Sequence, residues 1–348
     1  MRTLIFIVSY NAENHIGKVL RDIPDEFKNS PDTEILLIDD ASADKTVEAA
    51  RDFGARHALG NLKVFKNVAN QGYGGNQKLG YRYAVQEGFD VVAMLHGDWQ
   101  YTPLALPALI APFREDPGVD CVLGTRFGRE HSPLAGGMPI YKYIGNRILT
   151  KIQNRLAGAN LREWHTGYRV YRTSALAKIA FELNTAEFHF DTEILLQLID
   201  RRSTIVEVDI PTRYGYEICR VDGLRYAKDV VKAVLKYRLQ ACSLFYDIRY
   251  HPEVVLRRGP ESQDEVQYQH KFQSLSPHSL VANGDRLVAR GAKVLDIGCS
   301  TGYICKRLAQ RNACEVAGVD MLAAAMMKDC SFPYLQVDLE GDLEPLNA

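Results

Sequence analysis

Apolar runs of strand length alternate with helical patterns along the first 125 residues. Continuous apolar runs occupy residues 3–9, 34–40, 62–67, 90–96 and 119–125. Residues 14–23 and 44–53, between the first three runs, have apolar positions at helical spacing. Runs that are apolar on both faces suit strands covered on both sides. The alternation predicts an α/β protein with a mostly parallel sheet and helices on both faces.

Polar side chains follow several of these predicted strands. Tyr10, Asp40, Asp98 and Arg126 each come directly after an apolar run or close it. Ligands of open parallel sheets bind beyond the carboxyl ends of the strands. The sequence therefore predicts a ligand site at that edge.

Asp98 and Gln100 are candidate metal ligands. They offer hard oxygen atoms two positions apart, just past the strand 90–96. On an irregular loop such side chains can converge on one divalent cation, which would stabilise a diphosphate leaving group. The alternative is that Asp98 only caps the turn or helix that follows.

Composition narrows the class of protein. The 348 residues carry 42 basic and 43 acidic side chains, which gives no electrostatic argument for nucleic-acid binding. Seven cysteines without a C-x-x-C pair indicate reduced thiols and a cytoplasmic location. The N-terminal apolar stretch is expected to be a strand and not a signal peptide. No apolar run approaches the roughly 18 residues of a spanning helix, so any membrane contact would be peripheral, at the inner face.

Seven motifs together resemble family 2 glycosyltransferases of the GT-A fold. In chain order they are IVSYNAEN, LLIDDASADKT, NQGYGGNQKLGYRYA, LHGDWQYTP, VLGTRF, EWHTGYRVYR and FDTEILLQ. The dolichyl- and polyprenyl-phosphate sugar synthases are the most similar subgroup, over residues 1 to about 240. The resemblance implies inverting transfer of a sugar from a UDP- or GDP-sugar, with Mg²⁺ or Mn²⁺. The implied acceptor is a polyprenyl phosphate or a glycan.

The resemblance also implies a donor-binding set. Asp40, with Asp39 beside it, matches the acid that accepts hydrogen bonds from the base; alternatively, these acids cap a helix. Glycines before a helix expected at about Asn76 would let the backbone approach a ligand, or would only form a turn. The full set is Ser9, Tyr10, Asn11, Glu13, Asp39, Asp40, Gly72, Gly75 and Asn76.

His96 departs from the family pattern. Members commonly carry Asp-x-Asp at the metal loop, whereas this chain has His-Gly-Asp at residues 96–98. An imidazole could bind Mn²⁺ but suits Mg²⁺ poorly. His96 could instead be a buried, hydrogen-bonded side chain with no ligand role. The departure also leaves open a catalytically silent module that binds nucleotide sugars.

The acceptor decides which further residues matter. A lipid phosphate is already anionic and needs no general base, only arginines that position it. Four arginines match family positions near phosphates: Arg126, Arg147, Arg169 and Arg213. A hydroxyl acceptor would need a base, for which Asp191 is the first candidate and Glu193 the second. Each could alternatively be an ordinary surface or capping residue.

The pattern at residues 224–245 predicts a basic amphipathic helix. Such a helix could lie on an anionic bilayer, or pack on the sheet with its cations in solvent. A polar stretch follows, so we predict a glycosyltransferase domain at 1–245 and a linker at 246–278.

Residues 279–348 resemble the start of a class I S-adenosylmethionine-dependent methyltransferase. The segment GAKVLDIGCSTGYICKRLA predicts strand, glycine turn and helix; NAD is the alternative cofactor. The residues implied at the cofactor are Asp296, Gly298, Gly302, Asp320 and Asp338. We expect a truncated part of a bifunctional protein, without methyl transfer of its own. Its uncovered sheet would be exposed or pair between chains as a homo-oligomer.

Overall fold

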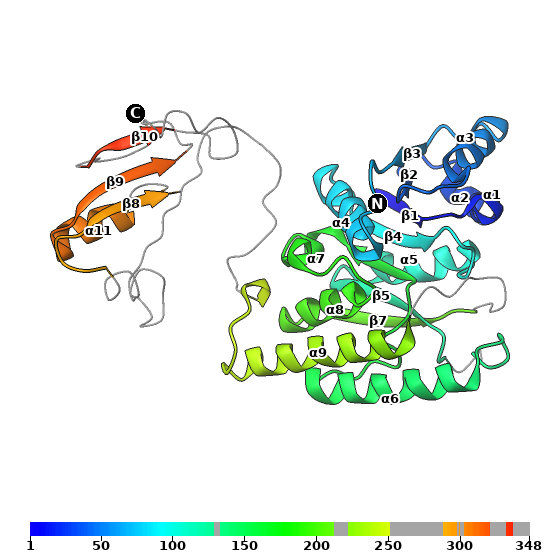
Figure 1. Cartoon of the computed structure of the whole chain (residues 1–348). Coiled ribbons are helices and arrows are strands. Elements are labelled where there is room, and N and C mark those ends of the chain that lie inside the picture. The colour runs from blue at the N-terminus through cyan, green and yellow to red at the C-terminus, as the bar shows by residue number, and fades with distance from the viewer. Residues whose placement is uncertain are drawn as a thin grey trace. The chain divides into compact units, whose positions relative to one another are not determined.

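The computed structural model describes residues 1–128, 133–211, 222–250, 288–297, 299, 303–320 and 332–336. The chain divides into two compact units, Met1–Gly259 and Pro260–Ala348 (Figure 1). No helix among these residues combines the length and apolar character needed to cross a membrane.

Seven strands in the described part of the first unit form one sheet, in the order β3-β2-β1-β4-β6-β5-β7. They are β1 (Thr3–Ser9), β2 (Thr33–Asp39), β3 (Leu62–Lys66), β4 (Val91–His96), β5 (Val119–Thr125), β6 (Arg169–Arg172) and β7 (Thr204–Asp209). The five predicted strands are confirmed to within a residue or two. Short β6, which the sequence did not predict, runs antiparallel between β4 and β5.

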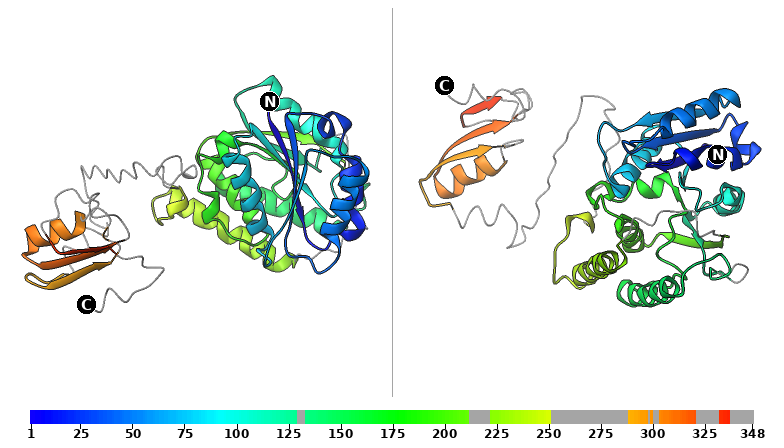
Figure 2. Two further views of the ribbon diagram at one scale, coloured as in Figure 1. Left: turned by 90° about the horizontal axis from the view of Figure 1, so that it is seen from above. Right: turned by 45° about the vertical axis from the view of Figure 1, so that its right-hand side comes forward.

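Helices cover both faces of this sheet (Figures 1 and 2). The α-helices are α1 (Glu13–Asp22), α2 (Asp25–Lys28), α3 (Thr46–Arg56), α4 (Tyr73–Gln86), α5 (Leu106–Glu115), α6 (Ile140–Ala157), α7 (Thr173–Leu176), α8 (Phe190–Asp200) and α9 (Gly223–Ala241). Three short 3₁₀ helices are η1 (Pro103–Ala105), η2 (Phe181–Leu183) and η3 (Ile248–Tyr250). The predicted α/β architecture is confirmed.

Alternate residues of β1 show how the two cores form. Leu4 and Phe6 pack in the core that α4, α8 and α9 cover, whereas Ile5 and Ile7 pack in the core beneath α1, α3 and α5. Successive side chains of a strand point to opposite faces, so an all-apolar strand requires this double covering.

The sheet register brings three strand ends together. Ser9 pairs with Asp39, and Val8 pairs with His96. The carboxyl ends of β1, β2 and β4 therefore lie side by side, and the loops that follow them share one edge.

Helix α9 packs on the domain through part of its apolar stripe. Val230 and Val234 are buried, whereas Leu235 and Leu239 are 46% and 44% exposed. Helix α9 therefore packs on the domain through one side, and its other side, with its cations, stays exposed. Tyr250 also joins the core, so the first unit continues beyond residue 245, where we predicted its end.

The described part of the second unit is a parallel sheet in the order β10-β9-β8 with one helix. Its elements are β8 (Lys293–Ile297), α11 (Tyr303–Asn312), β9 (Glu315–Asp320) and β10 (Tyr334–Gln336). The order strand, helix, strand is the one predicted from its motif. The likeness to methyltransferases stays a prediction.

A matched pair of glycines tests the packing between α4 and β1. A Cβ on Gly80 would lie 2.2 Å from the ring of Phe6, whereas a Cβ on Gly145 in α6 would meet nothing within 4 Å. Gly80→Ala should lower the free energy of unfolding by about 1–3 kcal/mol through overpacking. Gly145→Ala should raise it by up to about 1 kcal/mol through helix propensity. Urea unfolding measures both, and equal effects would contradict this packing.

Candidate active site

Two loops at the shared edge hold each other in place. Asn11 has a left-handed backbone (φ 51°), its N–H donates to Ser42 Oγ at 2.7 Å, and its Oδ1 accepts from Ala43 N at 2.9 Å. The Glu13 carboxylate accepts from Lys45 N at 3.2 Å, and Asp44 accepts from Glu13 N at 3.1 Å. Asn11 and Glu13, both predicted to bind the sugar donor, therefore shape the loop. Tyr10 between Ser9 and Asn11 is 43% exposed.

The hydrogen bonds of Asp44 strengthen this junction. Burial raises the pKa of Asp44, but hydrogen bonds from the Thr46 hydroxyl and from backbone amides outweigh it, so the pKa is lowered. Its position just before α3 also places a negative charge near the helix N-terminus, which is favourable.

Asp39 and Asp40 have different surroundings. Asp39 is fully buried, and its two oxygens accept from the backbone N–H and the hydroxyl of Ser42. Asp40 Oδ1 accepts from Asn67 Nδ2 and from Gln71 N, both at 2.8 Å. Of the two acids, only Asp40 keeps a carboxylate oxygen without a described partner, so Asp40 is the better candidate for the nucleotide base.

The glycine loop before α4 packs closely against other parts of the protein. Helix α4 begins at Tyr73, three residues before the expected start at Asn76. A Cβ on Gly72 would lie 2.8 Å from the carbonyl oxygen of Ala186, and one on Gly75 would lie 2.9 Å from the Gln71 side chain. Gly72 (φ 79°) thus admits protein backbone, and Asn76 is buried, donating to Ile38 O at 2.9 Å. These residues pack within the protein, and their predicted contact with a ligand stays a prediction.

The loop after β4, which the sequence predicts to bind a metal, is held in an unusual conformation. Trp99 has a φ of 62°, which costs an L-residue about 1–2 kcal/mol. Its indole N–H donates to Asp22 Oδ2 at 2.9 Å, and Lys18 lies 5.2 Å from its ring centroid. These contacts with α1 stabilise the turn at residues 98–100.

Asp98 keeps one carboxylate oxygen for a ligand. Its Oδ1 accepts from Gln100 N at 3.0 Å and closes the turn, while Oδ2 has no described protein partner. The helical cap that follows is supplied by Thr102, which accepts from Leu104 N. Asp98 is therefore not the helix cap. The Gln100 side chain likewise has no partner among the described residues.

His96 begins a chain of polar side chains that contact one another in a half-buried region. His96 Nε2 lies 3.2 Å from the Tyr73 hydroxyl, which donates to Asp191 Oδ2 at 2.9 Å. Burial and then the Asp191 charge raise the pKa of Tyr73 well above its ordinary value, so the hydroxyl stays protonated. Because its single proton goes to Asp191, His96 Nε2 must donate, and Nδ1 carries the lone pair when the ring is neutral.

Asp191 is enclosed by protein partners. Gln77 Nε2 donates to Asp191 Oδ1 at 3.2 Å, and Arg169 lies 3.9 Å from Oδ2. Glu193, the second candidate base, accepts from Thr185 N at 2.7 Å and pairs with Arg249 at 2.5 Å. Both carboxylates are buried, at 6% and 7% exposure, so neither is open to an acceptor hydroxyl in this conformation.

Arg126 and Arg169 are interior residues. Arg169 is fully buried and donates to the carbonyl oxygens of Trp164, Thr166 and Asp191, at 2.7–2.8 Å. Arg126 is ion-paired with buried Glu163 and donates to His165 O. This placement differs from the prediction that they surround a phosphate. The reason is that buried carbonyl and carboxylate groups of residues 163–166 need these donors.

Of the other two predicted arginines, the structure describes one. Arg147 is exposed on α6 and lies 5.9 Å from the ring centroid of Phe127. It is the predicted phosphate-binding arginine that stays accessible. Arg213 lies outside the described residues.

Sequence reasoning missed Tyr73, Trp99 and Gly167. Gly167 makes room for the imidazole, because a Cβ there would lie 2.5 Å from His96 Nε2. Its N–H donates to Tyr101 Oη at 2.9 Å. Tyr73 and Gly167 lie within two of the quoted motifs. The sequence signal that could have suggested a contact is that a bulky His96 requires a small residue, such as Gly167, beside it.

In the second unit, the described structure reaches two of the residues implied at a methyl donor. Asp296 lies on β8 and accepts from Cys305 Sγ at 3.3 Å. Asp320 ends β9, parallel to β8. Gly298, Gly302 and Asp338 lie outside the described residues.

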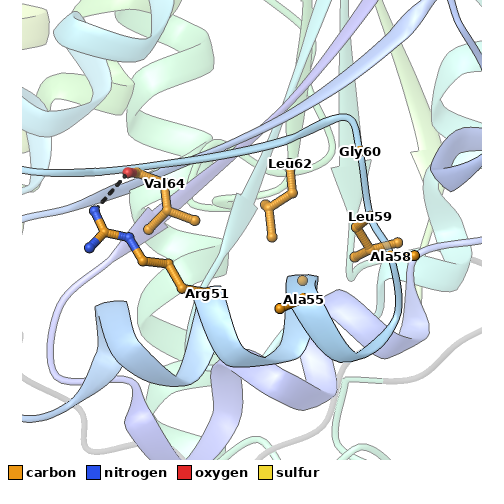
Figure 3. A pocket seen from close by; sticks show the side chains of 8 residues that line it. Arg51, Ala55, Ala58, Leu59, Gly60, Leu62 and Val64 are labelled. Atoms are coloured by element: carbon orange, nitrogen blue, oxygen red, sulfur yellow. Dashed lines mark hydrogen bonds between the residues drawn. The ribbon is translucent and has the colours of Figure 1, made fainter.

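A hollow of about 480 Å³ lies away from these residues, between α3 and β3 (Figure 3). It is lined mainly by small and aliphatic residues, with Arg51 donating to Val64 O at 3.5 Å. It contains no pair of groups suited to acid–base or metal chemistry, so it does not compete with the strand-end site.

His165 should make stability depend on pH. Burial, and then the charges of Arg126 and Arg169, lower the pKa of His165 from 6.5 to about 3. The unfolded chain therefore binds a proton below about pH 6.5 that the folded chain refuses. The free energy of unfolding should fall as the pH drops from 6.5 towards 3, by up to about 1.4 kcal/mol per pH unit from this residue. Urea unfolding of His165→Asn should show a shallower fall; an unchanged slope would contradict the assignment.

Comparison with known proteins gives relatives of the first unit. The family described as "Glycosyl transferase family 2" matches residues 4–180. The dolichyl-phosphate hexose transferase of Haloferax volcanii is 30% identical over 241 residues, 67% of this chain and 93% of the relative. The undecaprenyl-phosphate mannosyltransferase of Micrococcus luteus is 26% identical over 215 residues, 60% and 83% of the two chains.

A solved structure shares the fold. It is glucosyl-3-phosphoglycerate synthase from Mycobacterium tuberculosis in complex with Mg²⁺ and UDP. The TM-score is 0.51 at 17% identity, covering 71% of this chain and 80% of that one. The fold is therefore GT-A-like, as the resemblance of the motifs implied. With its strand-end site and family match, the chain is a glycosyltransferase that belongs to glycosyl transferase family 2.

Proposed function

We propose that this glycosyltransferase moves a sugar, with inversion, from a nucleoside diphosphate sugar to a polyprenyl phosphate. The relatives from Haloferax volcanii and Micrococcus luteus are named for transfer to dolichyl and undecaprenyl phosphate. A third, from Methanococcus voltae, is named for transfer from UDP-N-acetylglucosamine to dolichyl phosphate. These names support the class of donor and acceptor.

The observation that carries the proposal is the available Oδ2 of Asp98 at the end of β4. An anionic oxygen beside the amide of Gln100 suits Mg²⁺ or Mn²⁺, which favour oxygen ligands. A divalent cation there would neutralise the charge that grows on the leaving diphosphate. Among the described residues no three His, Cys, Asp or Glu side chains gather to hold a metal. We expect oxygens of the donor diphosphate to supply further ligands.

Both candidate bases are already bonded to other side chains, which favours a phosphate acceptor over a hydroxyl. Asp191 is bonded to Tyr73 and Gln77, and Glu193 to Arg249. A hydroxyl nucleophile needs a base within hydrogen-bond reach, whereas a phosphate oxygen is already anionic. Accessible Arg147 is the described arginine suited to positioning that phosphate.

Substitutions in the metal loop test the metal proposal. Asp98→Ala should lower metal-dependent transfer by about a thousandfold, because Lewis-acid stabilisation is worth several kcal/mol. His96→Ala should lower it by about tenfold, since the imidazole contributes through Tyr73 and supplies no essential ligand. Radiolabelled sugar transfer with Mn²⁺ and with Mg²⁺ measures both effects. Equal, complete loss in both variants would show that the ligand set is wrong.

The choice of acceptor is tested with polyprenyl phosphate and the matched polyprenyl alcohol. Transfer should occur to the phosphate and not to the alcohol, because neither of the two candidate bases, Asp191 and Glu193, is free to activate a hydroxyl. Product is measured by chromatography of the labelled lipid, with UDP- and GDP-sugars supplied in parallel. Transfer to the alcohol at a comparable rate would contradict the proposal. Calorimetric binding of donor without transfer to either acceptor would favour a silent binding module.

A further inference from the structure

Helix α6 buries polar side chains and exposes large apolar ones, which is the reverse of the usual arrangement in a helix that packs on a domain. Its buried side chains include the polar residues Thr150 and Gln153, and Gln153 Nε2 donates to Thr192 at 3.4 Å. Its outward face carries large apolar side chains in successive turns. Ile140, Tyr141, Ile144, Ile148 and Ile152 are exposed by 68%, 73%, 51%, 55% and 36%.

This apolar row has a regular origin in the sequence. The four isoleucines are spaced by four residues, so they form one stripe along the helix. Scattered exposed apolar residues are ordinary, but a contiguous row of them marks an interaction surface.

The same face is basic. Arg147, Lys151 and Arg155 are exposed beside the stripe, and α6 contains no acidic residue. None of the three forms an ion pair with a described residue. An apolar row flanked by unpaired cations is typical of helices that lie in the plane of an anionic membrane surface.

Helix α9 extends the surface. It packs beside α6, and both helices lie along one side of the first unit (Figures 1 and 2). Its outward face shows Leu235 and Leu239 together with exposed Lys228, Lys232 and Lys236. The basic character predicted for this helix thus adds to the isoleucine row of α6.

We propose that the outward face of α6, the isoleucine face, docks this enzyme on an anionic lipid bilayer. The isoleucines would enter the boundary between headgroups and acyl chains, and the flanking cations would meet lipid phosphates. A symmetric pair of copies joined through α6 is disfavoured, because it would bring two sets of these cations together without a described acid in the helix to neutralise them.

The position of α6 fits an acceptor embedded in the bilayer. Arg147 in this helix lies beside Phe127, two residues beyond the end of β5. One cation of the docking helix therefore lies against the segment that follows β5. This part of the inference rests on the proposed transfer to polyprenyl phosphate, whereas the docking itself does not.

Vesicle sedimentation of the full chain tests the docking. The chain should bind vesicles of phosphatidylcholine mixed with phosphatidylglycerol, bind phosphatidylcholine alone weakly, and be released by salt. Ile148→Ser should weaken binding by about fivefold. The matched control Leu183→Ser, at a leucine 51% exposed in η2, should leave binding unchanged. Thermal unfolding checks that both variants fold.

A second pair of variants separates the effect of the cations on α6 from the effect of the net charge of the whole chain. Lys151→Gln/Arg155→Gln should weaken binding by about fivefold for each residue, because each cation near the surface is worth about 1 kcal/mol. The control Arg51→Gln/Lys178→Gln changes the net charge equally, at exposed sites on α3 and after α7, and should have little effect. Equal loss in both pairs would overturn the proposal.

Further outcomes distinguish a bilayer from a second copy of the chain as the occupant of the isoleucine face, and docking from the proposed function. No vesicle binding by the unsubstituted chain, or a dimer in sedimentation equilibrium that Ile148→Ser dissociates, would overturn membrane docking. With docking correct, Ile148→Ser should keep transfer to a short, water-soluble prenyl phosphate and lose transfer to vesicle-embedded acceptor. Vesicle binding without transfer to either acceptor would refute the proposed function and leave docking intact.

Discussion

The buried guanidinium of Arg169 organises the centre of the first unit. It lies on β6 and satisfies the carbonyl oxygens of Trp164, Thr166 and Asp191 while compensating the Asp191 carboxylate. Removing one partner of such a buried pair typically costs about 3–5 kcal/mol, because a charge is left uncompensated. The antiparallel strand, the segment before it and the start of α8 are therefore held as one assembly.

That assembly reaches the metal loop through a single hydroxyl. Tyr73 links Asp191 to His96, and Gly167 leaves space for the imidazole. Trp99 pins the other end of the loop to α1 through Asp22. The loop that presents Asp98 is thus fixed from both sides, which suits the proposed role of positioning a diphosphate. His96 acts in this framework as a structural partner of Tyr73.

The strand-end site and the isoleucine face have different proposed roles. Polar loops after β1, β2 and β4 form the proposed donor site, while α6 and α9 present apolar and basic side chains. A lipid phosphate has a charged head and an apolar chain, so an enzyme that uses it needs both kinds of surface. The placement of Arg147 in α6, close to the end of β5, joins them.

The sequence by itself determined the strand and helix pattern, the strand-end edge and the candidate role of Asp98. These follow from local periodicity and from the rule that parallel strands present their carboxyl ends together. Only the tertiary structure decided that Arg126 and Arg169 are interior, that Gly72 packs against Ala186, and that the isoleucines of α6 face outward. Burial depends on which distant segments meet, and no local pattern encodes that: the partners of Arg169 lie up to 22 residues away.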